Sequence, residues 1–196
     1  MLTASVVAGT MTLAVALRVP KRSGWFTVTG FALAAIWTTG AFASGPVVFR
    51  ASLLARRRHA LGRGVLLGVA AFVAFVAVSR IATHIPLLAP ALRGVLSKAD
   101  TGLPLLVLIV ALVNGVAEEL FFRGAFYAAL KPHRAVAVST TTYVLVTVAS
   151  GNVALVAAAL VMGALLGVER RATGGVRSCV ITHVVWSVLM LLAFPR

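Results

Sequence analysis

Residues 103–130 read LPLLVLIVALVNGVAEELFFRGAFYAAL, an apolar run that carries two adjacent glutamates and one arginine. A helix needs about 20 mostly apolar residues to cross the hydrocarbon core of a bilayer, and this run is long enough to do so. A charged side chain in such a helix costs about 3 kcal/mol or more when it faces lipid, so Glu118, Glu119 and Arg123 must face protein or trapped water. The stretch therefore predicts a membrane helix whose polar side chains point into a helical bundle.

The whole chain has the composition of a membrane protein. Of its 196 residues, 61% are hydrophobic and 11% are charged, and the mean hydropathy is +1.05. Soluble domains carry roughly 25% charged residues, so water is not the main solvent of this chain. We predict an all-α fold, a multi-pass helical bundle in the cell membrane. It has about seven transmembrane spans, near residues 2–17, 25–49, 64–85, 103–130, 135–149, 152–168 and 176–194.

The net charge of +14 comes from 18 Lys and Arg against four acids, Asp100, Glu118, Glu119 and Glu169. In a soluble protein such an excess would suggest nucleic-acid binding. Here the basic residues lie mostly between apolar runs, where they set topology and meet anionic lipid headgroups. We therefore expect membrane lipids as partners and no nucleic acid.

The basic residues also predict an orientation. They cluster at 50–63, 131–134 and 170–177, after the second, fourth and sixth predicted spans, and a smaller cluster at 18–22 opposes this trend. Cytoplasmic loops carry an excess of Lys and Arg, which puts those three loops and the N-terminus in the cytoplasm and the C-terminus outside.

Residues 86–102 form the longest predicted connection between spans. They contain Pro86, Pro90, Gly94 and Asp100, residues that are typical of turns and loops. They divide the chain into two parts. Residues 1–100 comprise about three transmembrane helices and the connecting segment, and residues 101–196 comprise about four transmembrane helices and hold the candidate chemistry.

The two glutamates are predicted to have different surroundings. Glu119 and Arg123 lie four residues apart and share a helix face, so the arginine can neutralise that carboxylate. Glu118 points about 100° away, on the face it shares with Asn114 one turn earlier. The carboxylate without an arginine suits a general base that activates water. A structural alternative is an intramembrane ion pair beside a polar packing group, but two glutamates in so acid-poor a chain favour function.

The last predicted span supplies a histidine, His183, followed one turn later by Ser187. At about 1.5 Å per residue, His183 and Glu118 lie roughly 10 Å and 18 Å from the cytoplasmic ends of their helices, a difference that helix tilt can close. His183 is therefore a candidate partner of the glutamates. The alternative is a histidine that forms a hydrogen bond between helices.

The string Glu118-Glu119-x-x-x-Arg123-Gly124, followed by His183 on a later helix, resembles the CAAX prenyl protease and bacteriocin-processing (CPBP, Abi) family of intramembrane proteases. The resemblance covers about residues 101–194. Members also carry a Phe-x-x-x-His motif and a His-x-x-x-Asn motif. The register places Tyr143 and Thr147 at the former and His183 and Ser187 at the latter, so Thr147 stands where the family has histidine and Ser187 where it has asparagine.

The resemblance implies an intramembrane endopeptidase that hydrolyses a peptide bond in a membrane-associated peptide or protein through glutamate-activated water. It implies a catalytic set at Glu118, Glu119, Arg123 and His183, with Tyr143, Thr147 and Ser187 lining the site. Asn114, on the helix face that it shares with Glu118, is a further candidate lining residue. The use of a divalent metal stays open. Glu118 and His183 would be its ligands, whereas catalytic zinc normally has three protein ligands.

Two other functions remain open from the sequence. The replacements at Thr147 and Ser187 favour a catalytically impaired relative that acts as a membrane binding, scaffold or immunity protein. A small transporter with Glu118 and Glu119 as a proton relay is the third hypothesis. It lacks support from inverted repeats or broken helices.

Overall fold

The computed structural model describes residues 1–19, 24–45, 54–86, 88–99 and 104–193. Within these ranges it contains eight α-helices and one π-helical segment and no strand, which confirms the all-α fold. The helices are α1 (Leu2–Arg18), α2 (Gly24–Ala43), α3 (Leu54–Ala82), α4 (Leu88–Ala99), α5 (Pro104–Glu119), η1 (Leu120–Phe126), α6 (Ala135–Val148), α7 (Val153–Thr173) and α8 (Arg177–Ala193).

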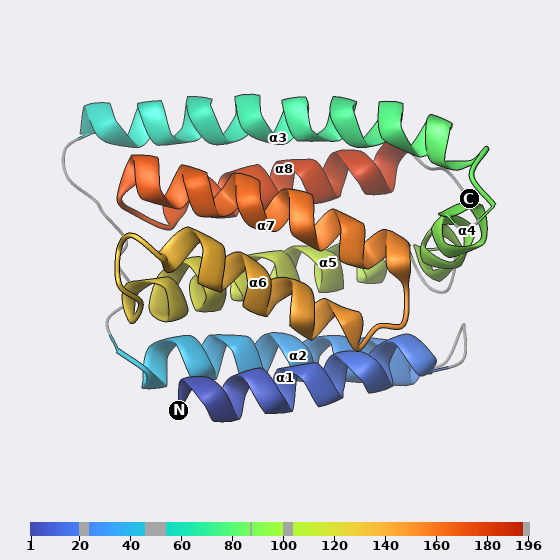
Figure 1. Cartoon of the computed structure of the whole chain (residues 1–196), viewed down its shortest axis with the longest axis horizontal. Helices are drawn as coiled ribbons and strands as arrows, with labels where there is room; N and C mark the ends of the chain where they lie inside the picture. Colours follow the sequence, from blue (N-terminus) through green and yellow to red (C-terminus); the bar gives the residue numbers. More distant parts are fainter. Residues whose placement is uncertain (20–23, 46–53, 87, 100–103, 194–196) are drawn as a thin grey trace.

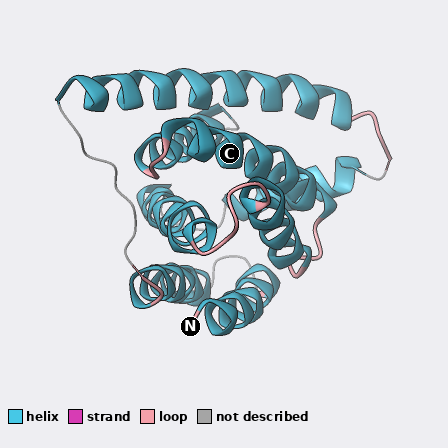
Figure 2. Ribbon diagram, turned by 60° about the vertical axis from the view of Figure 1, so that its left-hand side comes forward, coloured by secondary structure: helices cyan, strands magenta, loops and turns pink. Residues whose placement is uncertain are grey.

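The helices other than α4 form a layered bundle (Figure 1). The pair α1 and α2 covers one side, α5 and α6 lie in the middle, and α7 and α8 separate them from α3 on the opposite side. Figure 2 shows that α3 crosses the outer face of the bundle at an angle to the other helices. The short helix α4 lies at one end of the bundle, close to the turn between α6 and α7.

Four helical segments are long and apolar enough to cross a membrane: Gly24–Ala43, His59–Ala82, Leu105–Phe126 and Val153–Thr173. Three shorter apolar helices, α1, α6 and α8, lie beside them. The second span ends at Ala43, directly before Ser44-Gly45, where Gly45 takes a φ of +138° that suits glycine. Three predicted boundaries were wrong, because α2 ends at Ala43 rather than near residue 49, α3 begins before residue 64, and α7 continues past residue 168 through Arg170 and Arg171.

The prediction that residues 86–102 form only a connection was also wrong, because α4 occupies Leu88–Ala99 within them. Pro90 falls in the first turn of α4, where a backbone N–H has no intrahelical partner and proline is tolerated. The side chain of Asn152 donates to the carbonyl oxygen of Ala91 at 2.9 Å, so α4 is bonded to the turn that precedes α7. Of the basic residues used to predict orientation, Lys21, Arg22 and Arg50 lie outside the described residues.

Aromatic side chains fill the core between α2 and the segment that follows α5. Trp37 is 1% exposed, and its ring lies 4.9 Å from that of Phe121 and 5.0 Å from that of Phe122. Phe121 and Phe122 meet edge to face at 5.1 Å, an arrangement that aromatic pairs prefer. This cluster fixes the position of the helix that carries both glutamates and Arg123.

Glycines on α3 allow close contact with α8, the helix that bears His183. A Cβ added at Gly68 would lie 2.7 Å from the Cβ of Val185 and 2.9 Å from the carbonyl oxygen of Thr182. Gly64 faces Ile181 in the same way. In a bilayer, where lipid is as apolar as leucine, small residues hold helices together by permitting such approach.

We expect Gly68→Ala to destabilise the protein by about 1–3 kcal/mol, because the backbone oxygen of Thr182 cannot move aside without displacing α8. Gly62→Ala is the matched control. It lies in the same helix with nothing near its added Cβ, and it removes a helix-interior glycine, so it should be neutral or stabilising. Thermal unfolding in detergent checks both variants. Equal melting temperatures for the two would contradict the close contact of α3 with α8.

Candidate functional site

The helix that carries the glutamates changes its hydrogen-bond pattern at the site. Regular α-helix α5 ends at Glu119, and Leu120–Phe126 continue as the π-helical segment η1. Such segments are rare and occur often at functional sites. Arg123 lies within η1 and is 0% exposed, although it carries a full charge.

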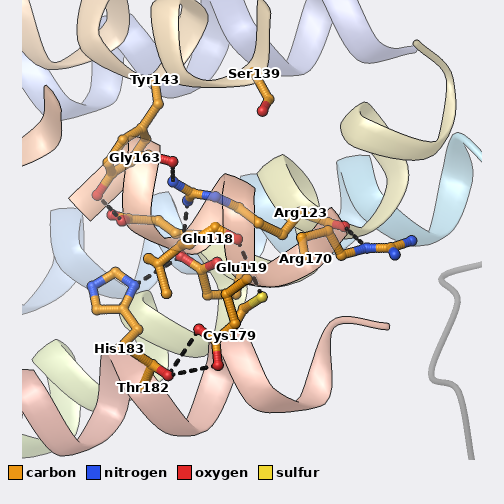
Figure 3. A network of polar contacts seen from close by, with 12 residues as sticks. Glu118, Glu119, Arg123, Ser139, Tyr143, Gly163, Arg170, Cys179, Thr182 and His183 are labelled. Carbon is orange, nitrogen blue, oxygen red and sulfur yellow. Dashed lines mark hydrogen bonds and ion pairs between the residues drawn. The ribbon is translucent and has the colours of Figure 1, made fainter. Parts of the chain in front are cut away.

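Glu119 accepts two hydrogen bonds from different helices. Its Oε1 lies 2.9 Å from Nη1 of Arg123 and 2.9 Å from Nδ1 of His183 (Figure 3). An ionised carboxylate can only accept, so Nδ1 of His183 is the donor. The Glu119–Arg123 ion pair expected from the sequence is thus confirmed, and it is completely buried. Glu119 also joins α5 to α8.

Arg123 makes contacts with two further helices. Its Nη2 donates to the carbonyl oxygen of Gly163 in α7 at 3.3 Å, and its guanidinium lies 4.8 Å from the ring centre of Tyr143 in α6. The carbonyl oxygen of Arg123 accepts a hydrogen bond from Nε of Arg170 at 2.7 Å. The arginine therefore holds α5, α6 and α7 together around Glu119.

Glu118 has different partners from those of its neighbour. Its Oε2 accepts a hydrogen bond of 2.7 Å from the Tyr143 hydroxyl, as Figure 3 shows. Within the described residues Glu118 has neither an ion pair nor a second hydrogen bond. The sequence expectation that the two carboxylates occupy different surroundings agrees with this geometry.

Two adjoining cavities meet at Glu118 and His183. The larger, about 450 Å³, lies between α1, α2, α5 and α8, and the smaller, about 200 Å³, lies between α1, α6 and α7. Both are lined by Leu13, Leu17, Glu118, Leu155, His183 and Trp186. Most of the lining is apolar, which is typical of sites that bind ligands through a few placed polar groups. Glu118 and His183 are the titratable side chains common to the two cavities.

Of the other predicted site residues, the structure places some at the cavities and one away from them. Asn114 lines the larger cavity, and its Nδ2 donates to the carbonyl oxygens of Gly30 and Val110 at 3.0 and 2.9 Å. Thr147 lines the smaller cavity, but its hydroxyl donates to the carbonyl oxygen of Tyr143 at 2.8 Å. Ser187 lines neither of these two cavities, although it follows His183 by one helical turn.

The donor set does not fit a metal. In the described part of the chain, no three His, Cys, Asp or Glu side chains converge as metal ligands. Glu119 and Nδ1 of His183 are already bonded to one another, which leaves Glu118 and Nε2 of His183, one donor fewer than a catalytic zinc usually takes from protein.

Sequence reasoning missed a third buried carboxylate beside this network. Glu169 is 3% exposed and accepts hydrogen bonds from the hydroxyls of Ser178 and of Thr182, the latter at 2.9 and 3.0 Å. Thr182 directly precedes His183, so Glu169 helps to set the position of α8. The scarcity of acidic residues could have indicated it, since Glu169 is one of only four acidic residues in the chain.

Comparison with known proteins gives one family. Residues 100–189 match the family model described as Type II CAAX prenyl endopeptidase Rce1-like. No curated protein and no solved structure matches the chain. The matched range contains the two glutamates, Arg123, Tyr143 and His183, whereas α1 and α2, which line the larger cavity, lie before it.

We expect Arg123→Met to destabilise the protein by about 3–5 kcal/mol, because it leaves the buried Glu119 carboxylate without its ionic partner. The double variant Glu119→Gln/Arg123→Met should be less destabilised than Arg123→Met, since the uncompensated charge is gone. Thermal unfolding in detergent gives both values. Arg171→Met, at an exposed arginine of α7, serves as the control and should change stability by no more than about 0.5 kcal/mol. A double variant less stable than Arg123→Met would argue against this ion pair.

Proposed function

Because residues 100–189 match the family model described as Type II CAAX prenyl endopeptidase Rce1-like, we propose that the chain is an intramembrane endopeptidase. Its substrate is a membrane-associated peptide or protein, and its nucleophile is a water activated by glutamate. The observation that carries this proposal is the position of Glu118 and His183 on the same two cavities, at the centre of the helical bundle.

In the proposed reaction Glu118 is the general base. It takes a proton from the water while the water oxygen forms a bond to the scissile carbonyl carbon. The carbon–nitrogen bond then breaks, and the same proton passes from Glu118 to the departing amine. Nδ1 of His183 donates to Glu119, so the lone pair of neutral His183 is on Nε2, where it accepts a hydrogen bond from the water and orients it. Glu119 orients His183 through the hydrogen bond to Nδ1, and Arg123 holds Glu119 in place.

The proposed path through the membrane has seven crossings. Four helical segments have the length and composition for this, and α1, α6 and α8 run alongside them. In Figure 1 the chain begins at one end of the bundle and α8 finishes at the other, as an odd number of crossings requires. The turn between η1 and α6 and the end of α7 lie at the end of the bundle where the chain begins. These segments carry the exposed residues Lys131, Arg134 and Arg171, which supports a cytoplasmic N-terminus in the cell membrane.

We also propose that the two parts of the chain, residues 1–100 and 101–196, pack as one bundle but play different roles in the site. Residues 101–196 supply Glu118, Glu119, Arg123 and His183, and residues 1–100 supply part of the cavity wall. Leu13 and Leu17 of α1 line both cavities, and Leu33 of α2 lines the larger one. The N-terminal helices would thus decide which substrates fit.

A second candidate function is that of a catalytically impaired relative that binds or protects a membrane peptide in the same cavities. Thr147 favours it, because the threonine hydroxyl is bonded to backbone and cannot serve as imidazole does. The two functions share a ligand class and differ in whether the bound chain is cut.

The seven-span path predicts that the ends of α6 lie on opposite sides of the membrane. Cys179, the single cysteine, is buried, so a Cys179→Ser background carries no native thiol. In it, His133→Cys should react with a membrane-impermeant maleimide from the cytoplasmic side and Ser150→Cys from the outside. Labelling of both from one side would contradict a crossing by α6.

Glu118→Gln should lower peptide cleavage by purified protein by about 100-fold or more, because the amide cannot accept a proton from water. The melting temperature should stay near that of the wild type, since glutamine still accepts the hydrogen bond from Tyr143. Cleavage of membrane peptides in detergent or liposomes measures the first quantity and thermal unfolding the second. Equal cleavage by a folded variant would contradict the role of Glu118 as base.

Capture from membranes separates the two candidate functions. A photoreactive amino acid at Leu17, which lines both cavities, would cross-link whatever chain enters them. If the protein is a peptidase, uncleaved substrate accumulates on Glu118→Gln and is scarce on the otherwise wild-type protein. Equal capture by both, with no cleaved product, would instead support the binding function.

A further inference from the structure

Tyr143 contacts Glu118, the glutamate of the pair that has no ionic partner among the described residues. Its hydroxyl donates to Oε2 of Glu118 at 2.7 Å, within the range expected of a charge-assisted O–H···O hydrogen bond. Tyr143 and Glu118 both line the smaller cavity, together with His183. The hydroxyl therefore reaches the carboxylate at the edge of the space where a water and a peptide would have to meet.

The ring of Tyr143 is held in place on two sides. It meets Phe122 edge to face at 4.9 Å, and the guanidinium of Arg123 lies over its face at 4.8 Å. A fixed ring gives its hydroxyl a fixed direction.

The neighbouring threonine does not compete for this role. The Thr147 hydroxyl donates to the carbonyl oxygen of Tyr143, one turn earlier in α6, and so is used within its own helix. Among the described residues, Tyr143 is the hydrogen-bond donor to Glu118. The donor to Glu118 is thus Tyr143, one helical turn before Thr147. Position 147 is the one at which this chain has threonine and the family motif has histidine.

We propose that Tyr143 is a positioning residue for Glu118 and compensates for threonine at position 147. This inference rests on the proposed peptidase function. By occupying Oε2, the Tyr143 hydroxyl leaves Oε1 as the oxygen that takes the proton from water, and it prevents the carboxylate from rotating away from His183. Tyr143 transfers no proton itself. Its contribution is to orient the base, which should affect the chemical step more than substrate binding.

Tyr143→Phe isolates the hydroxyl, because phenylalanine keeps the ring that packs on Phe122 and lies under Arg123. We expect kcat to fall by about 10- to 100-fold, the loss associated with one hydrogen bond to a charged group, and KM to change by less than about three-fold. The chain provides a matched control in its other tyrosine. Tyr127 also lies under a guanidinium, that of Arg170 at 5.1 Å, but among the described residues its hydroxyl forms no hydrogen bond with a carboxylate. Tyr127→Phe should retain the kcat of the wild type.

A rescue variant separates positioning from structural support. In Tyr143→Phe/Thr147→His the imidazole enters the same cavity and can donate to Glu118, so kcat should recover by about 10-fold over Tyr143→Phe. Unchanged kcat in folded Tyr143→Phe would overturn the inference. A loss of kcat shared by Tyr127→Phe, or one that the double variant does not reverse, would also overturn it. If the wild type itself cleaves no peptide, the proposed peptidase function fails first, and this inference fails with it.

Discussion

The burial of the Glu119 carboxylate among membrane helices is the constraint on which the site depends. A carboxylate without partners would be strongly destabilising in such surroundings, and Glu119 is stabilised by Arg123 from its own helix and by His183 from α8. Arg123 in turn bonds to Gly163 in α7 and lies over Tyr143 in α6. One buried charge thus specifies how four helices meet, and the cavities lie where they meet.

The same network explains why two adjacent glutamates can do different work. Glu119 is fully buried and is bonded to Arg123 and His183, so it cannot act on a ligand without losing partners that stabilise the fold. Glu118, one residue earlier, faces the cavities with a single neutral donor, Tyr143. Adjacent positions on a helix point about 100° apart, and this separation places one carboxylate in the framework and the other on the cavity.

Sequence spacing was sufficient where the interaction lies within one helix. The ion pair of Glu119 with Arg123 follows from their separation by four residues. Sequence spacing did not predict the contacts between different helices. Periodicity did not indicate that His183 would bond to Glu119 rather than Glu118, or that Ser178 and Thr182 would enclose Glu169. The register of the motif identified Tyr143 as a lining residue, but only the crossing of α5 and α6 brings its hydroxyl to Glu118.

The central claim is that Glu118 and His183 together hold a water in a peptidase site. It is tested most directly by an experimental structure, in lipid nanodiscs or detergent, at a resolution that shows ordered waters. The account predicts a water within hydrogen-bond distance of both Oε1 of Glu118 and Nε2 of His183, with Oε2 of Glu118 still bonded to Tyr143. A dry cavity, or Glu118 and His183 too far apart for a single water to bridge, would contradict it.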